Sequence, residues 1–120
     1  MSSAVYIELE TQINLKDWKS FCSQNSIEYS PNTVGMNVFY FGDTEIHFGE
    51  SSSEKLPLLP SGEIDFQSAH PKETANKIVV STYWMGNLEG VALVAKKILS
   101  RWSGSFSNDD ELNQLMALAQ

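Results

Sequence analysis

The clearest pattern of apolar and polar positions lies between residues 77 and 104, where a strand pattern is followed by a helix pattern. Residues 78–84 are almost all β-branched or aromatic, which is typical of a packed strand. Gly86 and Asn87 interrupt this run. Apolar residues then recur at helical spacing, at Leu88, Val91, Ala92, Ala95, Ile98, Leu99 and Trp102. The two patterns predict a sheet with at least one helix packed across it.

The N-terminal residues predict another strand and another helix. Val5, Ile7 and Leu9 alternate with polar residues, which is typical of a strand with one buried and one polar face. Asn14 has the side chain of a helix N-cap, and Asn25 is a typical C-terminal stop. The inward stripe of this helix comprises Leu15, Trp18, Phe21 and Cys22. A short strand over residues 27–29 is expected to follow.

A β-hairpin is predicted over residues 36–48, because Gly42 and Asp43 form a good two-residue turn between two apolar runs. The turn determines which residues lie opposite each other: Phe41 and Thr44, Tyr40 and Glu45, Phe39 and Ile46, Val38 and His47. Opposed residues share a sheet face. One face of the hairpin is therefore expected to line the core with Phe39, Phe41, Ile46 and Phe48, and the other to carry Val38, Tyr40, Glu45 and His47.

A long connection, at about residues 50–76, separates the hairpin from the next strand. It has little helix or strand periodicity and contains three prolines. Connections of this length in a small domain are usually functional loops or disordered segments. Leu56, Leu58 and Leu59 lie beside the prolines, so part of the connection is expected to pack back onto the domain.

The C-terminal residues predict a short edge strand and a last helix. Phe106 is expected in the strand, and Ser107 has the capping-box spacing to Asp110. The apolar positions Leu112, Leu115, Met116 and Ala119 follow at helical spacing.

This order of elements predicts an α+β fold in a single domain over residues 1–120. Strands joined by a hairpin and separated from helical runs favour a mainly antiparallel sheet of about four to five strands, with two to three helices on one face. The nearest named arrangement is ferredoxin-like, on element order alone.

Composition and charge narrow the classes of function. The chain carries a net charge of −7 and one cysteine. Residues 26–76 hold eight carboxylates and two lysines, whereas residues 77–106 hold four cations and one carboxylate. Nucleic-acid binding is disfavoured, because that affinity depends on clustered Lys and Arg. A lone cysteine predicts a reducing, cytoplasmic setting, and the sequence shows neither a secretory signal pattern nor an apolar run of the roughly 20 residues that span a membrane.

Motifs for catalysis are missing: the chain has no glycine-rich dinucleotide loop, no phosphate-binding loop and no nucleophile elbow. His47 is the best catalytic candidate, because Glu45 lies two residues away on the same strand face and could orient the imidazole. The commoner explanation is an exposed histidine beside an exposed glutamate. A metal site from Glu8, Glu45 and His47 has less support, so no metal or cofactor is predicted. Cys22, on an apolar helix stripe, is expected to be a buried, inert thiol.

The most distinctive predicted surface is the sheet face opposite the helices. Period-two alternation assigns to it the partner-binding candidates Tyr6, Glu8, Tyr40, Glu45, His47 and Tyr83, together with Ser81. Tyrosine is enriched at protein interfaces because it is large, fairly rigid and polar at one end. The sequence does not determine the strand order, so these groups can be contiguous or scattered.

Three functions stay open at this point. The leading hypothesis is a non-catalytic cytoplasmic module that binds a basic protein through the tyrosine and glutamate face, the acidic long loop or both, as a small acidic inhibitor or immunity-type protein does. The alternative is a small enzyme or ligand-binding domain with a crevice near His47, Tyr83 and Trp84. In the third, the protein is a homodimer rather than a monomer, and the aromatic face is its own interface.

Overall fold

The computed structural model describes residues 2–49, 55–83 and 85–117. Trp84, named above as part of a crevice, lies outside the described residues. The elements in chain order are β1 (Ser2–Asn14), α1 (Leu15–Gln24), β2 (Glu28–Tyr29), β3 (Val38–Phe41), β4 (Thr44–Phe48), β5 (Thr74–Tyr83), α2 (Leu88–Arg101), β6 (Gly104–Asn108), the 3₁₀ turn η1 (Asp110–Leu112) and α3 (Asn113–Ala117).

The fold is α+β, as predicted. Six strands form one sheet in the order β2-β3-β4-β5-β1-β6, and every ladder is antiparallel. The sheet exceeds the expected four to five strands because two short edge strands, β2 and β6, complete it at its two ends. Six elements, β1-α1-β4-β5-α2-β6, follow the βαββαβ order of a ferredoxin-like unit, and β2 and β3 extend the sheet beyond β4.

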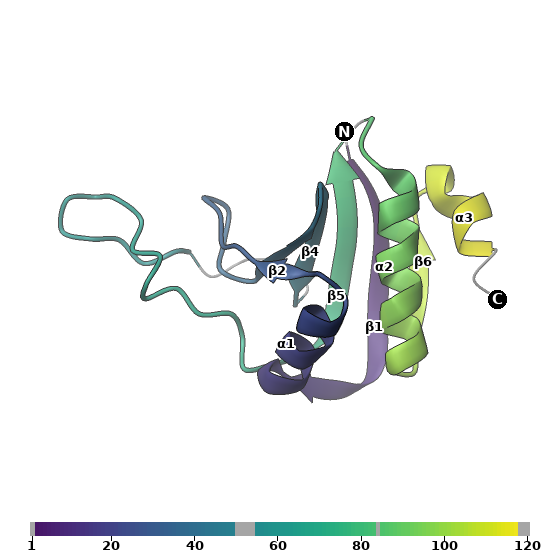
Figure 1. Ribbon diagram of the computed structural model, residues 1–120, viewed down its shortest axis with the longest axis horizontal. Coiled ribbons are helices and arrows are strands. Elements are labelled where there is room, and N and C mark those ends of the chain that lie inside the picture. The colour runs from purple at the N-terminus through teal and green to yellow at the C-terminus, as the bar shows by residue number, and fades with distance from the viewer. Residues whose placement is uncertain (1, 50–54, 84, 118–120) are drawn as a thin grey trace.

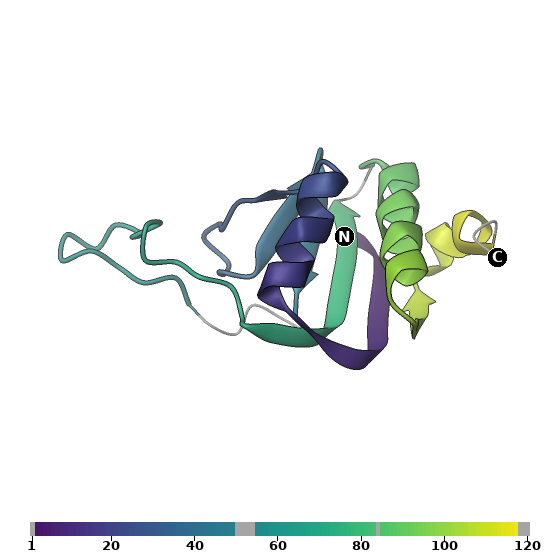
Figure 2. The ribbon, with the colours of Figure 1, turned by 60° about the horizontal axis from the view of Figure 1, so that its bottom comes forward.

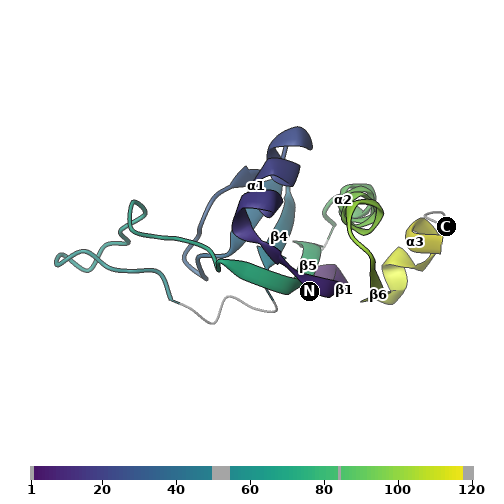
Figure 3. The same cartoon turned by 90° about the horizontal axis from the view of Figure 1, so that it is seen from below.

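Both long helices lie on the same side of the sheet (Figure 1, Figure 3). The centre of the core under α1 is Trp18, which is fully buried and stacks on Phe48 and Phe21 with ring centroids 5.2 and 5.5 Å away. Under α2, Val91, Ala95 and Ile98 are buried as predicted. The apolar faces of the helices and sheet therefore close one continuous core.

The predicted boundaries of the first helix agree with the structure. Asn14 caps α1, because its Oδ1 accepts a hydrogen bond from the Asp17 backbone amide at 2.8 Å, and Asn25 is the C-cap. Asn87 caps α2 in the same way by accepting from the Gly90 amide at 3.0 Å. Among the described residues, no helix is both long and apolar enough to cross a membrane.

The hairpin register is confirmed in all four pairs, from Phe41 with Thr44 to Val38 with His47. Gly42 makes the turn with φ of 59°, in the left-handed region that glycine adopts most readily. The registers therefore establish which side chains share the sheet face opposite the helices.

The prediction of a cap at Ser107 is wrong. Ser107 lies inside β6, and the following turn begins at Asp109. Asp109 makes no capping bond; its carboxylate instead accepts a hydrogen bond from the Ala4 amide at 3.0 Å, and its own amide donates to the Ala4 carbonyl at 3.0 Å. Strand pairing with β1 thus extends the chain past the position where the local sequence favours a helix start.

Residues 55–69, between β4 and β5, project away from the sheet and lie farthest from α3 among the described residues (Figure 1, Figure 2). We call residues 55–69 the arm. Its ends are buried at Leu56 and Ala69, whereas Leu58 and Leu59 are exposed. The expectation that part of this connection packs back is confirmed for Leu56, and not for the two other leucines.

Candidate functional site

The face of the sheet opposite α1 and α2 is the candidate site, and its residues are contiguous. The ladder registers place His47, Val79 and Tyr6 side by side across β4, β5 and β1. Glu8 lies two residues from Tyr6 along β1, opposite Lys77. The strand order therefore brings together the side chains that sequence periodicity could only assign to a common face.

The half of this face over β5, β1 and β6 is open. Tyr6 is 47% exposed there, and Glu8 lies beside it with a 3.9 Å ion-pair contact to the Lys77 ammonium. A shallow hollow of about 490 Å³ runs along this part of the face. It is lined by Tyr6, Ile7, Glu8, Lys77, Ile78, Val79, Ser105, Phe106 and Ser107. Tyr83, at the end of β5, is 68% exposed.

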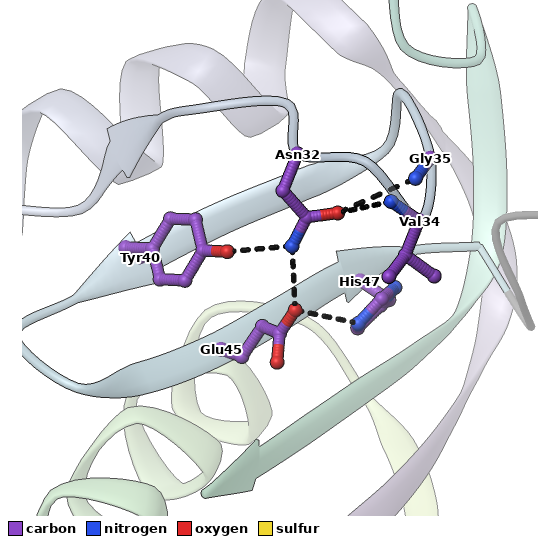
Figure 4. Close-up of polar contacts among 6 residues, drawn as sticks. All are labelled: Asn32, Val34, Gly35, Tyr40, Glu45 and His47. Carbon is purple, nitrogen blue, oxygen red and sulfur yellow. Dashed lines mark hydrogen bonds and ion pairs between the residues drawn. The ribbon is translucent and has the colours of Figure 1, made fainter. Parts of the chain in front are cut away.

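The half over β3 and β4 is covered, which corrects the prediction that the whole face is open. Residues 30–37, between β2 and β3, fold over it (Figure 4). Glu45 is only 9% exposed, and Val38 is fully buried although it shares this face. Glu45 and Val38 point away from the helices, and they are buried because the connecting segment packs on them.

Asn32 holds this covering segment in place. Its Nδ2 donates to Tyr40 Oη at 2.7 Å and to Glu45 Oε1 at 3.1 Å (Figure 4). Its Oδ1 accepts from the backbone amides of Val34 at 2.8 Å and Gly35 at 3.4 Å. All polar groups of the side chain are thereby used, which is the pattern of a structural asparagine in a turn.

The surroundings of Tyr40 favour its neutral phenol. Burial raises the pKa of Tyr40 above the ordinary tyrosine value, the hydrogen bond with Asn32 acts in the opposite direction, and the Glu45 charge adds to the rise. A neutral phenol can accept the Asn32 hydrogen bond without placing a second negative charge beside Glu45.

His47 lies at the edge of this cluster, with Nε2 3.6 Å from Glu45 Oε1 (Figure 4). The predicted proximity of the two side chains is therefore present. However, Glu45 Oε1 also accepts a hydrogen bond from Asn32, so the position of this carboxylate is explained by the covering segment as well as by the imidazole. A general base needs a substrate position within hydrogen-bond reach, and His47 does not line the hollow of about 250 Å³ beside Tyr83. That hollow is lined by Ser2, Ser3, Tyr83, Met85, Gly86, Leu88 and Glu111.

The residues considered for a metal site are separated in the fold. Glu8 lies on β1, one strand beyond β5, whereas Glu45 and His47 lie on β4. Within the described part of the chain, no three His, Cys, Asp or Glu side chains gather closely enough to hold a metal ion.

Cys22 is buried on the inner face of α1, as expected. Desolvation by burial raises the pKa of its thiol to about 12. The thiol is therefore neutral at physiological pH and unsuited to nucleophilic chemistry.

Two features were not found from the sequence. Asn32 is the first residue of the sequence Asn-x-x-Gly at positions 32–35, a signal that suggests an Asx turn but not the reach of its amide to Glu45. The exposed leucines of the arm were visible only as apolar residues among prolines, and nothing in that pattern shows on which side of the connection they lie.

Comparison with known proteins adds no family or function: the chain matches no protein-family model, and no curated protein is significantly similar to it.

Proposed function

We propose that this chain is a non-catalytic protein-binding module whose open sheet face binds a basic partner protein. The observation that carries the proposal is the pairing of exposed Tyr6 with Glu8 on a face that α1 and α2 leave uncovered. Tyrosine supplies contact area at low entropic cost, and a carboxylate beside it favours a partner with positive charge.

Charge supports a basic partner. The ladder registers put the exposed carboxylates Glu8 and Glu28 on this face together with Lys77, whereas Glu45 is buried beneath the covering segment. The whole chain carries −7, which favours association with a positively charged protein and opposes pairing of two identical acidic surfaces. The basic side chains Lys96, Lys97 and Arg101 belong to α2, on the other side of the sheet.

Within this class, an inhibitor or immunity-type protein that neutralises a basic toxin or nuclease in the cytoplasm fits best. Its size and charge suit that role, and a single buried cysteine suits a reducing compartment. Such an inhibitor needs a stable scaffold with an acidic, aromatic surface and no chemistry of its own.

The test begins with the tagged full chain purified from the cell that makes it, followed by identification of any copurifying protein and its stoichiometry. The purified partner is then titrated calorimetrically with wild type and with Tyr6→Ala/Glu8→Ala. Since interface tyrosines often cost about 2 kcal/mol or more when truncated, we expect binding to weaken at least about 30-fold. Leu93→Ala, on the exposed face of α2, is the matched control and should bind as wild type does.

Other outcomes decide between the remaining hypotheses. A folded double variant with unchanged affinity contradicts binding through the sheet face. A partnerless sample whose thermal midpoint rises with a small molecule favours the ligand-binding alternative, because a ligand that binds only the folded state stabilises it. A dimeric mass in solution that the double variant converts to monomer assigns the face to self-association.

A further inference from the structure

The arm is a second surface with the features of an interface. Three of the eight exposed large hydrophobic side chains among the described residues lie in it: Leu58 at 63%, Leu59 at 40% and Phe66 at 54% exposure. Soluble proteins seldom gather large apolar side chains on a projection without a binding role. The hollow beside Tyr6 lies on the sheet and shares no residue with the arm.

The arm is held in one conformation by its own backbone. Leu58 and Ile64 form an antiparallel bridge. The Leu59 amide donates to the Glu63 carbonyl at 2.7 Å, and the Asp65 amide donates to the Pro57 carbonyl at 2.9 Å. Ser68 closes the arm through a 2.8 Å bond from its Oγ to the Asp65 carboxylate. A preorganised projection loses less conformational entropy on binding than a mobile one.

The base of the arm is anchored to the sheet. Leu56 and Ala69 are buried, and the Lys72 amide donates to Asn37 Oδ1 at 2.7 Å, next to β3. Apolar residues are thus buried at the base and exposed farther out, where the chain projects from the sheet (Figure 1, Figure 2). A segment that inserts into a partner needs a base fixed to its own domain and apolar side chains that are exposed to the partner.

The charges of the arm specify its partner. The charged residues of the arm are Lys55, at its base beside the buried Leu56, and Glu63 and Asp65, which lie in the projecting part. A second copy of this acidic chain is therefore a poor occupant, since like charges would face each other. An apolar cleft rimmed by Lys or Arg complements both the leucine and phenylalanine side chains and the two carboxylates.

We infer that the arm inserts Leu58, Leu59 and Phe66 into an apolar, positively rimmed cleft of the basic partner, while the sheet face makes a separate contact. This inference rests on the proposed function and names the segment that enters the partner. Two contacts on one rigid chain act together, because the second forms at a high effective concentration once the first is made.

Photocrosslinking in the native cell tests the inference with the full chain. p-Benzoylphenylalanine replaces Leu58 in one variant, Tyr83 at the sheet face in a second and Leu93 on α2 in a third. We expect an adduct from position 58 to a basic protein, through an apolar peptide flanked by Lys or Arg, and none from position 93.

The other crosslinking outcomes separate the two proposals. An adduct from position 83 but none from position 58 overturns the arm inference and leaves the proposed function standing. Adducts from neither position count against both. Crosslinking of position 58 to another copy of this chain or to lipid overturns the commitment to a basic protein cleft.

Binding to the purified crosslinked partner gives the quantitative test. Leu58→Ser/Leu59→Ser/Phe66→Ser should weaken binding at least about 100-fold, because buried apolar anchors dominate interface energies, while the unfolding midpoint stays near that of wild type. Glu63→Lys should slow association about tenfold at low salt. Glu89→Lys makes the same charge change at an exposed position in the first turn of α2, on the helix side of the sheet, and should leave the rate close to wild type. If the two charge variants slow association equally, the effect comes from the overall charge of the protein and not from the arm, which contradicts the inference.

Discussion

Asn32 donates a side-chain hydrogen bond to Glu45 Oε1 at 3.1 Å, and this contact ties a connecting segment to the outer face of the sheet. The same amide binds Tyr40 Oη. A single asparagine therefore divides the face into a covered half over β3 and β4 and an open half over β5, β1 and β6.

Asn32→Ala should lower the free energy of unfolding by about 1–3 kcal/mol, because it leaves Glu45, which is only 9% exposed, without this donor. Urea denaturation measures the change. Gln12→Ala is the control, since its bond to Asn76 is exposed, and it should change stability by less than about 0.5 kcal/mol. Equal stability of the two variants would show that the segment is held by other contacts.

Gly104→Ala should destabilise the protein through the β1–β6 ladder. A Cβ at this position would lie 2.5 Å from the Glu8 carbonyl oxygen and 2.9 Å from Leu9 Cα, both backbone atoms that cannot move aside easily. We expect a loss of about 1–3 kcal/mol, by analogy with overpacking in cores. Ser105→Ala, one residue further along β6, is the matched substitution and should be nearly neutral by thermal denaturation.

The fold could be predicted because local and long-range signals agree. The alternation in β1, the stripe of α1 with its Asn14 cap, and the Gly42 turn each specify one arrangement, and the hairpin register follows from the turn. The failure at Ser107 has a different cause: a capping-box spacing is a local signal, and pairing with β1 overrides it.

The candidate site was predicted less completely, because face assignment and exposure are different properties. Alternation placed Tyr6, Glu8, Glu45 and His47 on one face, which the strand order then made contiguous. Burial of Glu45 depends on where residues 30–37 pack, and a short turn motif does not encode that position. Exposure of the arm is likewise a tertiary property.

Trp18 should be the most costly aromatic residue to truncate. It is fully buried and contacts Phe21, Phe39, Phe48 and Trp102. Trp18→Ala should cost about 3–5 kcal/mol or prevent folding. Trp18→Phe should cost less, because Nε1 is buried without a hydrogen-bond partner among the described residues and its removal leaves no polar group unpaired. Guanidinium denaturation of both variants provides the comparison, and an equal cost for the two would contradict it.

Cys22 gives the protein a predicted dependence on alkaline pH. Burial raises the pKa of the thiol in the folded state from the ordinary 9.0 to about 12, so the unfolded chain releases this proton first as the pH rises. Below pH 9 both states keep the proton and the group has no effect on the slope. Between pH 9 and 12 the unfolded state binds fewer protons, so stability falls by roughly 1.4 kcal/mol per pH unit from this group.

Comparing the urea denaturation of wild type with that of Cys22→Ala isolates this slope from the titration of lysines and tyrosines, which the variant retains. We expect the stability difference between the two proteins to shift in favour of the variant above pH 9. A difference that stays constant with pH would mean that the thiol is accessible to water in the folded state, and its rapid reaction with a disulfide reagent at pH 8 would confirm that result.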